Sequence, residues 1–166
     1  MEIIESRGAD PERRDLLRSF LESDTGDDFV MLNAIELNAV LPPTQGLPPD
    51  ADASDAIDGY MAHMWPALFA RACHPVAIGS AASGALDVWG INGAKHWSQG
   101  ALMRYRSRRD MMEISTNPDF QGPHDFKIAA LAKTIAFPLD PWAQAGDPRL
   151  LLGLLTLLSI AWFRPR

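Results

Sequence analysis

The chain has 166 residues, 47% apolar and 22% charged, which suits one domain with a sizeable core plus short extensions. Its net charge of −6 excludes a global positive field that would attract nucleic acid or anionic lipid. Cys73 is the only cysteine, which excludes an internal disulfide and is typical of a reducing, cytoplasmic compartment. No secretory signal is predicted, because the first residues lack a basic start followed by an apolar run.

The first third of the chain predicts a helix and a strand. Pro11 to Leu21 places apolar side chains on one face of a short helix whose first turn is acidic. Phe29 to Asn38 is apolar on both faces in its first half, as in a strand of a sheet that is covered on both sides. Asn33 interrupts this run, and its amide either ties down neighbouring structure or points into a ligand cavity.

A Pro-rich loop from Leu41 to Ala53 precedes the next helix, which Ser54 and Asp58 open. Pro66 should kink or restart this helix, because proline removes a backbone hydrogen bond. Its core-facing stripe has helical spacing and consists of Ile57, Tyr60, Met61, Met64, Leu68 and Ala72.

Two strands follow, from Pro75 to Ala81 and from Trp97 to Arg106, with a Gly-rich and Ser-rich loop between them. A small extra ribbon within this loop is predicted at Leu86, Val88 and Trp89.

The last part of the domain predicts two helices and a strand. Ser107 with Asp110 forms a capping box, and Asn117-Pro118 repeats the start signal with Pro at the first helical position. Lys133 to Leu139 alternates as a strand, and Pro138 indicates a sheet edge. The second helix should present one face, made of Phe120, His124, Ile128 and Leu131.

The predicted order is βαββαβ between two terminal helices, an α+β ferredoxin-like fold with an antiparallel sheet and helices on one face. Its parts are an N-terminal helical extension (1–27), the α+β domain (28–140), and a linker with a hydrophobic C-terminal helix (141–166). The sheet face without helices is also apolar, and a second copy of the same sheet would cover it.

Several stretches resemble one family: MLN at Met31 to Asn33, the helix of Tyr60, and RYRSR from Arg104 with NPDFQ from Asn117. The chain is similar here to the uncharacterised family called domain of unknown function 1330, within the dimeric α–β barrel superfamily. The resemblance implies a homodimer whose sheets close into a barrel. It also implies a ligand cleft between each sheet and its own helices, near Asn33, Tyr60, Arg104, Tyr105 and His124.

Recognised catalytic signatures are absent from the sequence. Metal binding needs converging ligands, and the adjacent Cys73 and His74 diverge, so neither a metal nor another cofactor is predicted. No phosphate loop or nucleophile elbow occurs, so the catalytic residues, and whether the chain is an enzyme, stay undetermined. His124 beside Asp125 is read as a packed histidine rather than an oriented base, because adjacent helical residues face different ways.

Arg104, Arg106, Arg108 and Arg109 form a basic run that has three interpretations. A surface paired with acids, such as those of the N-terminal segment, is favoured over an anionic-ligand clamp. Nucleic-acid binding is the third interpretation, and it is not predicted.

The tail from Leu150 to Phe163 is uncharged and apolar on nearly all sides. As a helix it would rise about 21 Å, short of the ~30 Å hydrocarbon core of a bilayer. It is interpreted as a tether to the inner membrane, a helix buried in the oligomer, or a helix that docks on a membrane complex. The residues expected to make this contact are Leu151, Leu155, Leu158 and Trp162.

The sequence therefore leaves two candidate functions. One is a small-molecule-binding dimer, with an unknown ligand, tethered by its tail. The other is a non-catalytic accessory subunit of a membrane-associated complex, favoured by the tail and by the absence of catalytic motifs.

Overall fold

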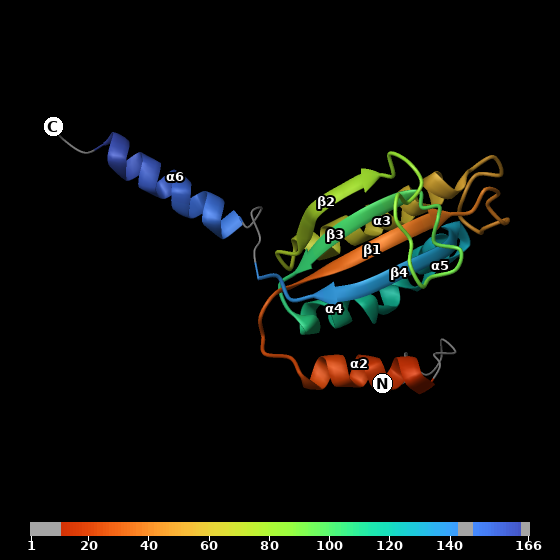
Figure 1. The fold of residues 1–166 in the computed structure, drawn as a ribbon, viewed down its shortest axis with the longest axis horizontal. Helices are drawn as coiled ribbons and strands as arrows, with labels where there is room; N and C mark the ends of the chain where they lie inside the picture. Colours follow the sequence, from red (N-terminus) through yellow and green to blue (C-terminus); the bar gives the residue numbers. More distant parts are fainter. Residues whose placement is uncertain (1–10, 143–147, 164–166) are drawn as a thin grey trace.

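The computed structural model describes residues 11–142 and 148–163, so Arg164 and part of the predicted linker lie outside the described residues. Its sheet is antiparallel with strand order β2-β3-β1-β4 (Figure 1). The strands are β1 (Phe29–Leu37), β2 (His74–Ser80), β3 (Gln99–Tyr105) and β4 (Leu131–Leu139). The helices are α2 (Pro11–Glu22), α3 (Ala53–Phe69), α4 (Arg108–Ser115), α5 (Gln121–Ala130) and α6 (Pro148–Trp162), with a 3-10 turn at Pro118–Phe120. This is the predicted ferredoxin-like βαββαβ order, with β4 at an edge.

The register of β1 and β3 shows which residues face the helices. Phe29 lies opposite Tyr105, and Asn33 lies opposite Ala101. Because side chains alternate along a strand, the odd-numbered residues of both strands share one face. Met103 packs in the core beneath α3, so this shared face is the one that the helices cover.

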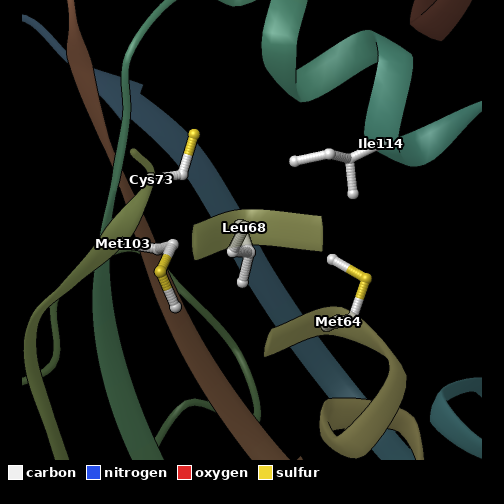
Figure 2. Packing of buried hydrophobic residues seen from close by; sticks show 5 residues of the cluster. All are labelled: Met64, Leu68, Cys73, Met103 and Ile114. Atoms are coloured by element: carbon white, nitrogen blue, oxygen red, sulfur yellow. The ribbon is translucent and has the colours of Figure 1, made fainter. Parts of the chain in front are cut away.

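The core lies between the sheet and helices α3 and α4. Met64 and Leu68 of α3 and Ile114 of α4 converge on Met103 of β3 and on Cys73 (Figure 2). Partly buried aromatic side chains pack around this cluster: Tyr60, Trp65, Tyr105 and Phe120.

A second cluster joins α3 to α5. Ala53, Ala56 and Ala130 are buried in it, and Phe126 packs against them. A Cβ atom on Gly59 would lie 3.2 Å from the ring of Phe126, so the absence of a side chain there lets the two helices approach closely.

The N-terminal helix packs on the domain as predicted. The ring of Phe20 lies edge-on to Phe29, with centroids 5.3 Å apart. The guanidinium group of Arg108 lies over the Phe20 ring, 4.5 Å from its centroid, and donates to the carbonyl of Phe20 and to Ser23 Oγ.

Several local predictions need correction. Helix α3 is capped by Asp52, not Ser54: the Asp52 carboxylate accepts from the amides of Ser54 and Asp55, and the Asp55 carboxylate accepts from the Asp52 amide. Helix α3 also runs through Pro66 without restarting. The Ser107 cap is confirmed, since its Oγ accepts from the Asp110 amide at 3.0 Å.

The loop from residue 81 to residue 98 contains no ribbon, and Leu86 and Trp89 are exposed. The loop is held instead by Lys133, which donates to the Gly93 carbonyl and lies 4.6 Å from the Trp97 ring centroid. The predicted face of α5 is wrong at Ile128, which is 60% exposed, and at Leu131, which begins β4.

The sheet face opposite the helices is apolar and open. In Figure 1 the strands lie in front of α3 and α5. The loop that follows β2 crosses this face at the end of the sheet away from α6. Ile135, Phe137 and Leu139 project from β4 on this side and are 37%, 44% and 37% exposed. Leu32 and Leu102 lie opposite each other beside them and are half-buried.

Helix α6 extends away from the sheet (Figure 1). From Leu150 to Phe163 every large apolar side chain is at least 50% exposed. Among the described residues, no helix has both the length and the apolarity to cross a bilayer.

Candidate functional site

Three polar side chains gather where α3 lies beside α5. The rings of Tyr60 and His124 meet edge-to-face, with centroids 6.3 Å apart and planes at 71°. One turn beyond His124, Lys127 places its Nζ 5.5 Å from the Tyr60 centroid. His124 and Lys127 can both reach Tyr60 because residues three apart share a face of α5. Tyr60 and His124, two of the predicted site residues, are therefore neighbours.

Tyr105 extends this group toward the sheet. It faces the helices from the end of β3 and stacks on Phe29, with centroids 5.4 Å apart and planes at 12°. Burial raises the pKa of the Tyr105 phenol, and the neighbouring Tyr60 raises it further. Tyr105 is therefore a neutral phenol at physiological pH, able to donate a hydrogen bond.

Asn33 lies in the middle of the same sheet face and is half-buried. Its register partners are Ala101 on β3 and Ala136 on β4, so small side chains flank it on both sides. Its amide Nδ2 donates to the Met31 carbonyl at 3.2 Å. Within the part of the chain that the structure describes, Asn33 Oδ1 accepts no hydrogen bond, which leaves it available to a ligand.

Arg104 does not join this group. It alternates with Met103 and Tyr105 along β3, so it projects from the opposite face of the sheet. Its Nε lies 2.6 Å from Asp28 Oδ2, and its Nη1 donates to the Ala72 carbonyl at 2.9 Å. Arg104 therefore links the start of β1 to the turn after α3, and its predicted position in the cleft is wrong.

A pocket of about 270 Å³ adjoins Arg104. Its walls come from the end of α3, the start of β2, β3 and the first turn of α6: Phe69, Ala72, Cys73, His74, Arg104, Arg106 and Arg149. Its charges are largely compensated, since Arg104 pairs with Asp28 and Arg106 pairs with Asp110.

The arginine run is engaged within the protein. Arg106 donates from Nε and Nη2 to both carboxylate oxygens of Asp110, at 2.8 and 2.9 Å. Arg109 pairs with Glu113 at 2.8 Å. These contacts support the paired-surface interpretation: Arg106 and Arg109 pair with acids of α4, and Arg104 pairs with Asp28 at the end of the N-terminal segment.

No three His, Cys, Asp or Glu side chains within residues 11–142 and 148–163 gather in a way that could hold a metal ion.

Lys127 is the member of the group that sequence reasoning missed. Burial lowers the pKa of its amine, and the like charge of Arg13 lowers it further. The available signal was its position three residues after His124, on the same face of α5. The signal was weak because a lysine in the last turn of a helix is common without any ligand.

No family model matches the chain, and no curated protein matches it. The resemblance to the domain-of-unknown-function 1330 family therefore stays a prediction.

Among solved structures, the chain is similar to RPA0582, a protein of unknown function from Rhodopseudomonas palustris. The two are 20% identical with a TM-score of 0.63, over 81% of this chain and 96% of that one. The methylated RPA0582 protein is 19% identical with a TM-score of 0.66, over 82% and 96%. A dimeric protein of unknown function and ferredoxin-like fold from Bacteroides fragilis is more distant, at 9% identity and TM-score 0.39, over 70% and 97%. At these identities the RPA0582 structures are evidence for the fold alone.

Proposed function

We propose that the protein is a homodimeric α–β barrel that binds a small molecule between its sheet and helices α3 and α5. The contact of Tyr60 with His124, beside the buried phenol of Tyr105, is the observation that carries the proposal. Polar groups from two helices and a strand meet there, next to an apolar core. Such an arrangement is typical of sites that hold small molecules by a few oriented polar groups.

The open sheet face supports a second copy of the chain as the dimer partner. A contiguous exposed apolar patch is costly in water, and an identical sheet would cover it with matching chemistry. Phe137 lies at the middle of the apolar row of β4, where a two-fold related copy would meet it. The domain limits 28–140, with extensions on either side, belong to this proposal.

The proposed binding site can be tested on the untagged full-length protein isolated from its native source. Native mass spectrometry should give a dimer mass and an additional small mass per protomer. Tyr60→Phe and His124→Gln should reduce the retained mass. His63→Gln is the matched control, because His63 is an exposed histidine of α3 whose Nδ1 contacts the Gly59 carbonyl. Retention that is equal in all variants, or absent from the native protein, would count against the site.

Helix α6 favours a second function, that of an accessory subunit in a membrane-associated complex. Its apolar residues are exposed on all sides, and its hydroxyl groups add no polar face. Thr156 Oγ1 donates to the Leu152 carbonyl and Ser159 Oγ to the Leu155 carbonyl, both at 2.8 Å. Such a helix is most stable when an apolar medium or partner surrounds it, which supports a tether to the cytoplasmic side of a membrane.

A further inference from the structure

Lys127 is a half-buried cation without a counter-ion among the residues that the structure describes. Lys127 takes part in no ion pair there, and the acids Asp28, Asp110 and Glu113 each pair with an arginine. A partly desolvated ammonium group is costly when it is not paired, so the missing partner needs an explanation.

The groups around Lys127 do not neutralise it. Tyr60 offers the face of its ring at 5.5 Å, which attracts a cation but carries no charge. Arg13 of α2 is the one charged group whose effect on Lys127 is resolved, and it has the same sign. Arg13 itself pairs with no acid in the described part of the chain. Lys127 therefore experiences the repulsion of another cation, and no acid among the described residues forms an ion pair with it.

The C-terminal end of α5 gives only a partial explanation. A lysine in the last turn of a helix is stabilised by the helix dipole, and the structure has Lys127 there. The dipole does not explain why the amine lies over the ring of Tyr60.

We propose that the small molecule bound at this site is an anion, such as a carboxylate, whose charge is held by Lys127 and whose planar body packs on Tyr60. This inference rests on the function proposed above and names the ligand class of the same site. Asn33 and Tyr105 carry no charge at neutral pH, so in this proposal they serve the neutral part of the ligand.

Benzoate and benzamide are suitable probes, because they have the same shape and differ in charge. Their binding to the full-length protein is followed by NMR through the ring signals of Tyr60 and His124. Benzoate should bind at least tenfold more tightly than benzamide. The comparison needs no variant, so it holds even if a substitution disturbs the fold.

Variants then assign the preference to Lys127. Lys127→Met keeps the length of the side chain and should bring benzoate down to the affinity of benzamide, whereas Lys127→Arg should keep the preference. Lys95→Met is the matched control, since Lys95 is an exposed lysine of the loop after β2, and it should change nothing.

The outcomes separate the two proposals. Equal binding of both probes at Tyr60 and His124, or a preference that survives Lys127→Met, would overturn the anion inference and leave the binding site standing. If neither probe perturbs these rings at any concentration, both the ligand class and the site are refuted.

Discussion

Arg104 and Asp28 lie 76 residues apart and form an ion pair of 2.6 Å across the start of the sheet. Their side chains are 5% and 23% exposed, so the pair is largely removed from water. The same guanidinium group also donates to the Ala72 carbonyl, which joins β1, β3 and the turn after α3. Arg104 is therefore a structural residue, and its substitution should affect stability before function.

Removing the acid of this ion pair should destabilise the protein more than removing the arginine. Asp28→Asn leaves the buried guanidinium group without its counter-charge and should lower the free energy of unfolding by about 2–4 kcal/mol. Arg104→Met removes the charge and keeps much of the packing, so it should cost less. Urea unfolding at neutral pH measures both, and the reverse order would contradict this assignment.

Stability should fall as the solution becomes acidic. The hydrogen bond from Arg106 holds the pKa of Asp110 below its usual range, against the effect of burial. Burial opposes ionisation of Asp28, but the hydrogen bond and charge of Arg104 outweigh it, so the pKa of Asp28 is also lowered. A lowered pKa in the folded state stabilises the protein above the unfolded value, near pH 4, and this contribution disappears as the pH falls through the folded value.

The urea midpoint should therefore decrease steadily below about pH 5. Asp110→Asn should lower stability at neutral pH and flatten this decrease, because one of the responsible carboxylates is gone. An unchanged pH profile in that variant would show that Asp110 does not contribute.

Ala72 offers a stabilising substitution. Its φ of 54° lies in the left-handed region, which costs a residue with a Cβ roughly 1–2 kcal/mol. Ala72→Gly should therefore raise the free energy of unfolding by about 0.5–1 kcal/mol, after the larger entropy of glycine in the unfolded chain is subtracted.

Ala70→Gly is its control, because Ala70 has an ordinary helical φ of −59°. That change should lower stability by roughly 0.5–1 kcal/mol. Thermal unfolding of the two variants should thus shift in opposite directions, and a shared direction would refute the strain at Ala72.

Phe137→Lys should break the proposed dimer. A charge at the middle of the open sheet face would have to be buried between two copies, so the dissociation constant should rise at least tenfold, about 1.4 kcal/mol. Sedimentation equilibrium is the measurement. Ile128→Lys is the control, since Ile128 is an exposed apolar residue on α5, and it should leave the dimer intact. A monomeric wild-type protein would contradict the proposal directly.

Helix α6 should bind neutral lipid through its apolar side chains. Leu151→Glu with Leu158→Glu should abolish flotation of the full-length protein with phosphatidylcholine vesicles, because both side chains are exposed on one face of α6 with Leu155 and Trp162. Leu86→Glu, in an exposed loop, is the control and should float like the wild type. If the wild type stays with the unbound fraction, α6 serves another partner.

The element order was predictable because its signals are local. Caps such as Ser107 and Asn117, the stripe of α3 and the alternation of β4 each depend on neighbours within a few residues. The strand order then follows from the few connections that a βαββαβ chain allows. The cap of α3 lies two residues before the predicted position because Ser54 and Asp52 offer similar side-chain acceptors, and only the geometry of the turn selects one.

The candidate site was only partly predictable. Strand alternation puts Arg104 and Tyr105 on opposite sides of the sheet, so the cleft implied by the resemblance could hold only one of them, and the structure shows that this one is Tyr105. Only the tertiary structure decided that α5 lies against α3 so that His124 and Lys127 meet Tyr60, because that contact depends on Phe126 packing over Gly59 far along the chain. The apolar character of α6 was likewise evident from its residues, whereas the exposure of its side chains depends on how the rest of the fold packs.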